Sequence, residues 1–438
     1  MNLREQLIAN TSPGLEYEDN NPSVSLPSDP LVKLIAFYLP QFHAIPENDA
    51  WWGKGFTEWT NTAKAIPRFV GHYQPRLPGE LGFYNLTHAE TLTRQSILAR
   101  RYGIYGFCFH YYWFFGKHLL ERPIDLLLSR PDIDLPFCIN WANESWTRRW
   151  DGYESSILQK QEHSPEDDIA FAESVEPFMR DPRYIRIEGR PLLMLYRPGR
   201  LPDAAQTVAR WRAHFIKVGL GDPYIAMAQA FGDGVAAKYG MDAAVGFPPF
   251  WAGAPKLDNL ELLDPKYSGD VVDYAAMAQA TIAGYATDQR VFPGVCPSWD
   301  NEARKPGRGS CFTGSTPERY GNWLHAACDA AIRAFPPAER LVFINAWNEW
   351  AEGAYLEPDR HFGYAYLSQT AKVVNELTES APARISEKHS ALPPMIAMTP
   401  KRSFQRRIRQ FGRRGLNRLA DIAEDISWRL RKIVASLT

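Results

Sequence analysis

The chain has 438 residues, 45% of them hydrophobic and 23% charged, which is enough to bury a large core. No run reaches the roughly 18 apolar residues of a membrane span, and the N-terminus lacks the basic and apolar segments of a signal peptide. The five cysteines include no C-x-x-C pair, which favours a reducing compartment and predicts a cytoplasmic protein.

The charge is divided unevenly along the chain, although 49 Lys and Arg nearly balance 50 Asp and Glu. Residues 401–438 carry 11 Lys and Arg against 3 Asp and Glu, so the rest of the chain is acidic. An acidic main body argues against nucleic acid as its substrate.

Eight apolar runs bounded by turn residues are predicted strands. In chain order they span residues 33–40, 103–113, 135–146, 191–198, 223–231, 242–250, 291–299 and 340–350. Helical patterns separate most of them, for example at 88–103, 204–219 and 318–335. This alternation predicts an α/β fold, a (β/α)8 TIM barrel. A doubly wound sheet is the alternative, but no Gly-rich phosphate turn follows any strand.

Four segments follow from this pattern. Residues 1–30 are predicted to be an N-terminal arm, 31–375 the barrel, 376–400 a linker mixing Pro, Ser and Ala, and 401–438 a basic helical tail. In the tail, apolar residues recur at alternating steps of three and four between Leu416 and Leu437. This spacing indicates an amphipathic helix that either lies on an anionic membrane surface, which would place the protein at the inner membrane, or contacts a partner helix.

Polar and aromatic side chains follow the aliphatic part of each predicted strand. Because barrel enzymes place their active sites at the carboxyl ends of the strands, these side chains are expected to share one rim. The candidate substrate-binding residues are Tyr38, Trp52, Glu58, Trp59, His110, Tyr111, Tyr112, Asn140, Trp141, Glu144, Trp146, Tyr196, Arg197, Trp299, Trp347 and Asn348.

The segment "NAWNEWAEG" places Glu349 and Glu352 three residues apart between tryptophans. Cleaving a glycosidic bond usually needs two carboxyl groups, and apolar walls raise the pKa of the one that donates a proton. We therefore predict Glu349 and Glu352 as the catalytic residues, ahead of the rival carboxylates Glu144, Glu58 and Asp300. The simpler alternative is a helix N-terminus, where acidic residues favour the helix dipole.

Four segments in order resemble the family 99-like glycoside hydrolase domain, the WbsX-like group of surface-polysaccharide loci, which is distantly similar to the endo-α-mannosidases. They are "FYLPQFHAIPENDAWWGKGFTEWTN", "GFCFHYYWF", "INWANESWTRRWDG" and "NAWNEWAEG". The resemblance covers about residues 31–375 and implies a (β/α)8 barrel and a retaining mechanism without a metal or other cofactor.

The resemblance also implies the roles of the two glutamates. Glu349 matches the residue that acts as a base on the substrate's own 2-hydroxyl, which gives an anhydro-sugar intermediate, and Glu352 matches the general acid/base. Such a mechanism needs a 2-hydroxyl anti to the leaving group, as in α-mannosides and α-rhamnosides.

Three functions stay open from the sequence. The first is a retaining glycoside hydrolase or transglycosidase acting on α-linked mannose- or rhamnose-type polysaccharide. The second is a glycosyltransferase of O-antigen or capsule biosynthesis, and the third is a glycan-binding module without catalysis. No H-E-x-x-H or similar motif indicates a metal site.

Overall fold

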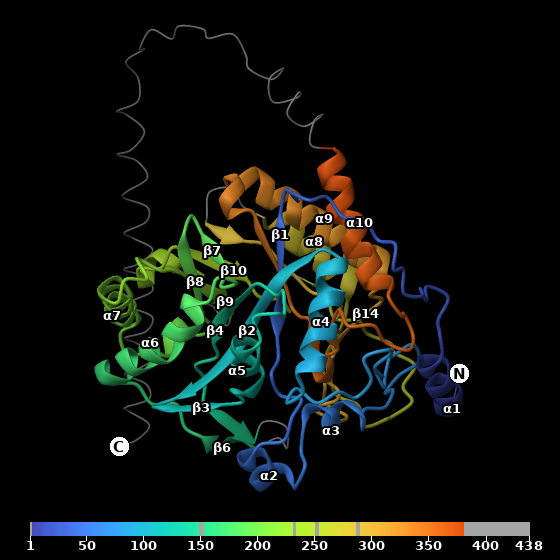
Figure 1. Cartoon of the computed structure of the whole chain (residues 1–438). Coiled ribbons are helices and arrows are strands. Elements are labelled where there is room, and N and C mark those ends of the chain that lie inside the picture. Colours follow the sequence, from blue (N-terminus) through green and yellow to red (C-terminus); the bar gives the residue numbers. More distant parts are fainter. Residues whose placement is uncertain (1, 149–152, 231–233, 250–253, 286–289, 381–438) are drawn as a thin grey trace, which may run out of the picture. The chain divides into compact units, whose positions relative to one another are not determined.

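Nine parallel strands form the central sheet of this computed structural model, in the order β12-β10-β9-β8-β4-β2-β1-β15-β13. Figure 1 labels β10, β9, β8, β4, β2 and β1 of this sheet. The structure describes residues 2–148, 153–230, 234–249, 254–285 and 290–380. Only Pro293 separates β12 (Val291–Phe292), which pairs with β10, from β13 (Gly294–Val295), which pairs with β15. One interrupted strand therefore joins both edges of the sheet, and the eight strand positions form a nearly closed (β/α)8 barrel.

All eight predicted strands are present. Besides the interrupted one they are β1 (Lys33–Tyr38), β2 (Ile104–Phe114), β4 (Phe137–Trp141), β8 (Arg190–Leu195), β9 (Tyr224–Gln229), β10 (Ala243–Gly246) and β15 (Leu341–Ile344). Most of the predicted runs continue for several residues beyond the carboxyl end of the strand that the structure shows. The extra residues lie in the loops of the rim, where aromatic side chains continue the apolar pattern after the ladder has ended.

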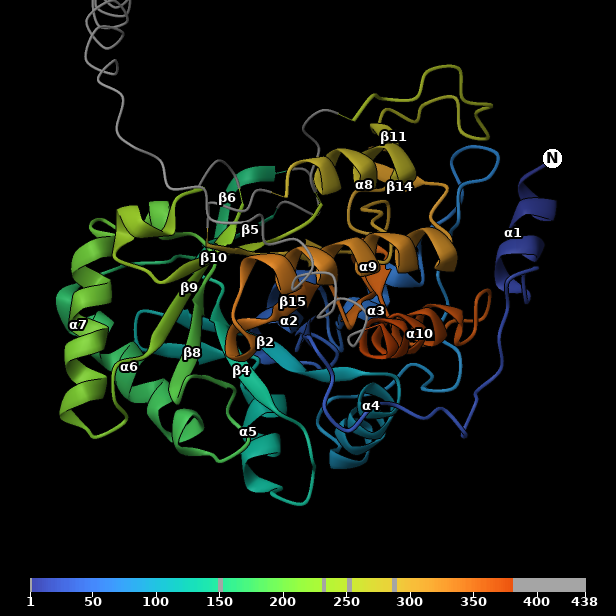
Figure 2. The ribbon, with the colours of Figure 1, turned by 90° about the horizontal axis from the view of Figure 1, so that it is seen from above.

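Helices follow the strands and cover the outside of the barrel (Figure 2). They are α4 (Ala89–Arg101), α5 (Arg122–Ser129), α6 (Pro165–Arg180), α7 (Ala204–Lys217), α8 (Tyr274–Ala283), α9 (Pro317–Ala334) and α10 (Ala365–Glu379), with the short η3 (Ala236–Tyr239) after β9. In α9 the side chain of Thr316 caps the first turn, and Tyr320, Leu324, Ala327 and Ala331 form one buried stripe.

Short elements build the rim at the carboxyl ends of the strands. They are α2 (Pro46–Trp52), α3 (Glu58–Thr62), β5 (Trp146–Arg148), β6 (Tyr153–Gln159), β16 (Asn348–Glu349) and β17 (Ala354–Tyr355). Elsewhere β11 (Val271–Asp273) pairs with β14 (Cys311–Thr313), β3 (Lys117–Leu119) with β2, and β7 (Arg186–Ile187) with β8.

The N-terminal 30 residues are not only an extended arm, because α1 (Leu3–Thr11) lies within them. A capping box between Asn2 and Glu5 starts this helix, and the Asn10 side chain donates to the carbonyl oxygens of His72 and Gln74, both at 2.8 Å. The side-chain bonds of Asn10 attach the helix to the loop before α4.

The C-terminal boundary lies later than predicted, since α10 continues to Glu379, beyond the expected linker start at residue 376. The chain divides into two units, Met1–Ala381 and Pro382–Thr438. The predicted tail and nearly all of the predicted linker lie outside the described residues. Within the part of the chain that is described, no helix is long and apolar enough to cross a membrane.

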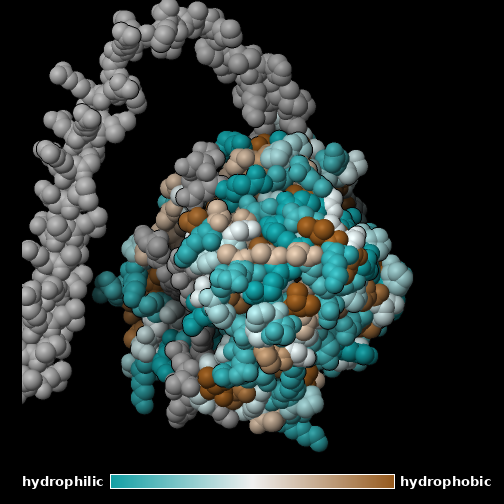
Figure 3. Space-filling view, turned by 90° about the vertical axis from the view of Figure 1, so that its left-hand side faces the viewer, coloured by the Kyte–Doolittle hydropathy of each residue, from teal (hydrophilic) through white to brown (hydrophobic). Residues whose placement is uncertain are grey.

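The molecular surface is mainly hydrophilic on the face shown in Figure 3, where hydrophobic side chains are scattered or form small groups. Scattered apolar residues are normal for a protein surface and mark no binding site by themselves. The functional site is therefore better sought in a cavity than on this face.

The closure of the barrel depends on two glycines that let strands approach closely. A Cβ atom on Gly294 would lie 1.7 Å from the carbonyl oxygen of Gly246. We expect Gly294→Ala to lower the free energy of unfolding in urea by about 1 to 3 kcal/mol, because the strands must move apart. Gly234→Ala is the control, since a Cβ atom there meets nothing within 4 Å. Equal stability of the two variants would contradict this account of the closure.

Candidate active site

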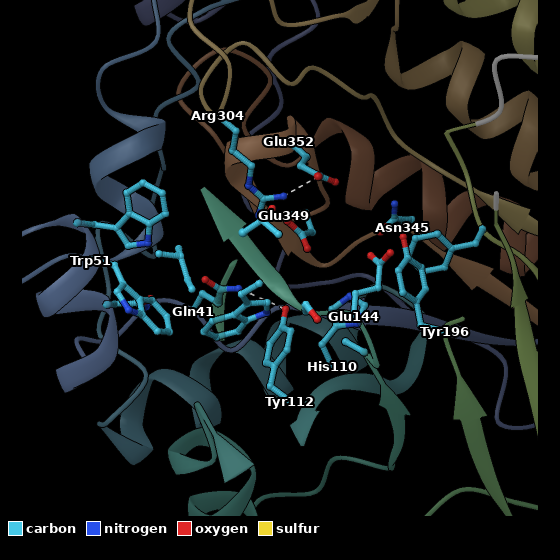
Figure 4. Close-up of a pocket in the computed structure, with 18 residues that line it drawn as sticks. Gln41, Trp51, His110, Tyr112, Glu144, Tyr196, Arg304, Asn345, Glu349 and Glu352 are labelled. Atoms are coloured by element: carbon cyan, nitrogen blue, oxygen red, sulfur yellow. Dashed lines mark hydrogen bonds and ion pairs between the residues drawn. The ribbon is translucent and has the colours of Figure 1, made fainter. Parts of the chain in front are cut away.

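A cavity of about 230 Å³ opens at the carboxyl ends of the barrel strands (Figure 4). Its lining residues are Gln41, Asn48, Trp51, Trp52, His110, Tyr112, Ala142, Glu144, Ser145, Trp146, Thr147, Leu158, Tyr196, Phe247, Arg304, Asn345, Glu349 and Glu352. Aromatic faces beside convergent polar groups are typical of a site for a small polar ligand such as a sugar.

Glu349 and Glu352 reach this cavity from the loop after β15. The Asn348 side chain accepts from the backbone N–H of Leu39 at 2.8 Å and donates to its carbonyl oxygen at 3.0 Å, which fixes the loop to the end of β1. Glu349 ends β16, and Glu352 follows in one short turn, η5 (Trp350–Glu352). Gly353 then takes a φ of 58°, a left-handed conformation that favours glycine.

Arg304 lies beside Glu349 and Glu352 (Figure 4), and it also contacts a third glutamate, Glu58. Its Nη1 donates to Glu352 Oε1 at 2.5 Å, and its Nη2 donates to Glu349 Oε2 at 2.9 Å. Its Nε and Nη2 both lie 3.2 Å from Glu58 Oε2. One guanidinium therefore shares its positive charge among three carboxyl groups, two of which line the cavity.

The environments of Glu349 and Glu352 differ. Burial, with the nearby charges of Glu352 and Glu58, raises the pKa of Glu349 to about 8, although Arg304 acts in the opposite direction. The Glu352 side chain is 25% exposed and also accepts from Trp299 Nε1 at 3.3 Å. In the free site, burial and the neighbouring carboxyl groups therefore favour a protonated Glu349 at neutral pH.

His110 supplies a neutral polar group to the cavity. Its ring stacks on Phe37 at 5.8 Å, and its Nδ1 lies 3.2 Å from Asn140 Nδ2. Burial, together with the charge of Arg304, lowers the pKa of His110 to about 4. At neutral pH the ring is uncharged, and donation from Asn140 to Nδ1 leaves the proton of the imidazole on Nε2.

Glu144 contributes a further carboxylate to the cavity and is held by a neighbouring arginine. Arg197 Nη1 donates to Glu144 Oε1 at 2.5 Å. Near it, the ring of Trp146 packs edge-on against Trp51 at 5.8 Å and against Tyr112 at 5.0 Å. These contacts tie α2, β2 and the β5–β6 hairpin into one aromatic wall.

A buried ionic network lies behind Glu352. The backbone N–H of Asp300 donates to the Glu352 carbonyl oxygen at 2.6 Å, and Arg76 Nη1 donates to the Gly353 carbonyl oxygen at 3.2 Å. His72 and Arg76 hold the pKa of Asp300 below its usual value, against the effect of burial. The network therefore fixes the backbone that carries Glu352 with an ionised carboxylate as its anchor.

His72, Asp300 and Cys311 also place one possible ligand atom each within 4.8 Å of one another, the one such group among the described residues. Both ring nitrogens of His72 are already used, because Nδ1 accepts from Arg68 N at 3.0 Å and Nε2 lies 2.8 Å from Asp300. This hydrogen bonding leaves the imidazole no free lone pair, so the residues present do not fit a metal ion.

The predicted site residues fall into three groups. Eight line the cavity: Trp52, His110, Tyr112, Glu144, Trp146, Tyr196, Glu349 and Glu352. Four others do not line the cavity but contact a residue that does. Glu58 contacts Arg304, Asn140 contacts His110, Arg197 contacts Glu144, and Trp299 contacts Glu352. The structure thus separates groups that a ligand can touch from groups that orient them.

The remaining six predicted residues do not line the cavity, and most have a structural partner. They are Tyr38, Trp59, Tyr111, Trp141, Trp347 and Asn348. Tyr38 donates a hydrogen bond to Gln95, Tyr111 to Ser174, and Asn348 to the carbonyl oxygen of Leu39. Trp59 donates to the carbonyl oxygen of Tyr84, Trp141 donates to that of Trp113, and Trp347 packs against Phe107. Successive side chains of a strand point to opposite faces. Since His110 and Tyr112 face the cavity, Tyr111 between them points away from it.

Several lining residues were missing from the prediction. Arg304 is the most important. The sequence offered it only as a hydrogen-bond partner of a rival carboxylate such as Glu58, and not as a residue that lines the site. Gln41 and Asn345 are among the polar side chains that the sequence placed at the rim, although neither was a substrate-binding candidate. Trp51 adjoins the predicted Trp52, whereas Phe247 follows β10 without any polar neighbour.

Comparison with known proteins places this chain in a family. Residues 34–370 match the family model described as Glycosyltransferase WbsX. The chain belongs to the WbsX family. Two relatives of the same name, WxcX from two strains of Xanthomonas campestris pv. campestris, are each 47% identical over 360 residues. The match covers 82% of this chain and 52% of each relative, so the chain spans about half the length of these relatives.

Solved structures share the barrel of this WbsX family member. The GH99 endo-alpha-mannosidase from Bacteroides thetaiotaomicron aligns with a TM-score of 0.51 at 15% identity, covering 80% of this chain and 98% of that one. A glycoside hydrolase-like protein aligns with a TM-score of 0.52 at 13% identity, covering 82% and 98%. At these identities the likeness shows the fold alone, which is a glycoside hydrolase-type barrel.

The pKa of Glu349 predicts how stability changes with pH. Between about 4.5 and 8 the folded state keeps a proton that the unfolded chain releases, so this carboxyl stabilises the fold less as the pH rises. Gln cannot titrate, and Glu349→Gln should therefore gain at least about 1 kcal/mol relative to the natural chain between pH 5 and pH 8. Urea unfolding at both pH values measures this difference, and a constant difference would contradict the raised pKa.

Proposed function

We propose that the chain is a retaining glycoside hydrolase or transglycosidase acting on α-linked mannose- or rhamnose-type polysaccharide. The observation that carries the proposal is the pair Glu349 and Glu352, three residues apart at the rim of the barrel and joined by the guanidinium of Arg304. The aromatic wall around this pair offers faces on which the C–H groups of a sugar can stack.

In the proposed mechanism Glu352 donates a proton to the leaving oxygen while Glu349 accepts the proton of the substrate's 2-hydroxyl. The 2-oxygen then attacks the anomeric carbon as the bond to the leaving group breaks, which gives a 1,2-anhydro sugar. Water or a second sugar opens this ring from the opposite side, giving its proton to Glu352, and Glu349 returns its proton to the 2-oxygen. Two inversions retain the anomeric configuration.

The order of roles follows the resemblance of the motif to the endo-α-mannosidases. Since the raised pKa belongs to Glu349, the proposal includes transfer of the resting proton to Glu352 when substrate binds. A base with a pKa near the working pH is also strong enough to accept a proton from a hydroxyl group.

The alternative is glycosyl transfer, since the description of the family names a glycosyltransferase. A nucleotide sugar would be the donor in such a reaction. A diphosphate needs cationic groups or a cluster of backbone N–H groups. Among the described residues that line the cavity, Arg304 is the one arginine, and Arg197 contacts the lining residue Glu144. Both arginines are bound to carboxylates. This charge pairing favours hydrolysis, or transfer between sugars, over transfer from a nucleotide sugar. The third alternative, a glycan-binding module without catalysis, would not need the pair Glu349 and Glu352.

Substitution of either glutamate tests the catalytic assignment. We expect Glu349→Gln and Glu352→Gln each to lower turnover at least about 100-fold, because each loses a proton-transfer step. The measurement is the rate on the best substrate from a panel of aryl α-mannosides, aryl α-rhamnosides and nucleotide sugars. Near-normal activity of either variant, or turnover of a nucleotide sugar alone, would exclude the proposed reaction.

The same experiment separates the two roles. An activated leaving group such as 2,4-dinitrophenolate needs no protonation, so it should restore much of the rate to Glu352→Gln but not to Glu349→Gln. Trapping of a 2-fluoroglycosyl ester on Glu349 would instead establish a direct carboxylate nucleophile.

We also propose that residues 401–438 hold the protein at an anionic membrane surface. The support is the composition of this segment, with basic residues beside an apolar stripe, since each basic residue contributes about 1 kcal/mol near such a surface. A partner helix is the competing explanation of the same pattern.

Sedimentation with lipid vesicles distinguishes these explanations. We expect the full chain, but not residues 1–380, to sediment with vesicles that contain anionic lipid at low salt, and neither to sediment with neutral vesicles. Identical behaviour of the two chains would exclude the membrane and leave a partner protein as the target of the tail.

A further inference from the structure

Glu58 is a buried carboxyl group that lies behind Glu349 and Glu352 and does not line the cavity. It begins α3, its side chain is fully buried, and it is not part of the cavity lining. Its Oε2 accepts from Arg304 Nε and lies 3.2 Å from Arg304 Nη2, and its Oε1 lies 3.4 Å from Asn61 Nδ2. A buried carboxylate that binds one guanidinium affects the position and the ionisation of every other carboxyl group bound to the same guanidinium.

The guanidinium of Arg304 connects Glu58 directly to both proposed catalytic groups. The same Nη2 touches Glu58 Oε2 at 3.2 Å and Glu349 Oε2 at 2.9 Å, so these two oxygens lie no more than about 6 Å apart. The Nη1 atom holds Glu352 at 2.5 Å. With all three carboxyl groups ionised the cluster would have two uncompensated negative charges in a largely buried space, which is costly.

We propose that Glu58 is a positioning residue of the acid pair, which does not react itself but fixes Arg304 and determines the pH range in which Glu349 and Glu352 hold one shared proton. This inference rests on the proposed function, because it gives the proton of the cluster a catalytic use. It also reassigns Glu58, which the sequence predicted as a substrate-binding residue.

The charges around the pair agree with this role. Glu349 faces Arg304, Glu352, Glu58 and the phenol of Tyr112, and after burial the largest effect on it comes from Arg304. Among these groups Glu58 and Glu352 raise the pKa of Glu349, whereas Arg304 lowers it. Burial raises the pKa of Glu58 itself, although Arg304 acts in the opposite direction. At any pH at which Glu58 is ionised, removing its charge must therefore ease ionisation of the pair, and removing the charge of Arg304 must hinder it.

The sign of the expected change does not depend on which glutamate is the acid. In Glu58→Gln, which keeps the shape of the side chain, the midpoints of the pH–rate profile that belong to the pair should move about one unit toward lower pH. In Arg304→Gln the same midpoints should move toward higher pH. Opposite shifts from the two ends of one ion pair are not produced by a general loss of structure.

The test uses the full chain and the aryl glycoside that the panel shows to be turned over fastest. Glu339→Gln is the matched control, because Glu339 is also a buried glutamate held by an arginine, Arg290, but lies before β15 at the opposite end of the barrel. Its pH midpoints should equal those of the natural chain. If Glu58→Gln shifts no further than this control, or shifts upward, the inference is wrong while the proposed function stands.

A second measurement needs no turnover. The infrared carbonyl band of protonated carboxyl groups, followed against pH, should disappear at lower pH in Glu58→Gln than in the natural chain. Glu349→Gln identifies the part of the band that belongs to Glu349. If Glu58→Gln leaves the titration of that part unchanged, the inference is wrong. If the natural chain turns over no glycoside of the panel but the infrared band shifts as expected, only the proposed function is rejected.

Discussion

The ion pairs of Arg304 are the interaction on which the site depends. Three carboxyl groups can be placed together out of water only when a cation lies among them and part of their charge is neutralised by protons. The loop that carries Arg304 is correspondingly rigid: Glu302 accepts from the backbone N–H of Gly307 with both oxygens and is held by Arg68, and a Cβ atom on Gly309 would lie 2.4 Å from Glu302 N. A guanidinium on a loop without these contacts would not keep three partners at once, because ordering it would cost conformational entropy.

The order of strands explains how residues so distant in sequence meet. Glu58 follows β1, Glu349 and Glu352 follow β15, and Arg304 follows β13, and these three strands are neighbours in the sheet. All their carboxyl ends point to the same rim, so the cluster assembles from adjacent loops rather than across the barrel. His110 and Glu144 come from β2 and the segment after β4, the next two strands along. The acid cluster and the rest of the cavity thus occupy one continuous arc of the rim.

The sequence predicted the barrel and the acid pair because both leave local signals. Aliphatic runs of strand length identify the eight strand positions of the barrel, and a carboxylate pair between tryptophans is conspicuous in "NAWNEWAEG". It could not show that Tyr111 points away from the cavity while His110 and Tyr112 face it. A strand that is buried on both faces has no alternating polar pattern to show which side chains point inward. The sequence offered Arg304 as a partner of a rival carboxylate but not of the acid pair, because an arginine in a polar loop resembles any solvated arginine until its partners are known. The α1 helix was missed although its capping box, Asn2 and Glu5, was readable.

The charge state of the cavity bears on its ligand as well as on its chemistry. Glu144 is bound by Arg197, Arg304 is shared among three carboxyl groups, and the lowered pKa of His110 keeps its ring neutral. The described lining therefore offers carboxylate oxygens, amides and a neutral imidazole, together with aromatic faces. Hydroxyl groups can donate to these oxygens and accept from the amides, whereas a phosphate or carboxylate would meet negative charge. A neutral sugar chain matches such a surface better than an anionic one, and this is the same preference that distinguishes a glycoside substrate from a nucleotide sugar.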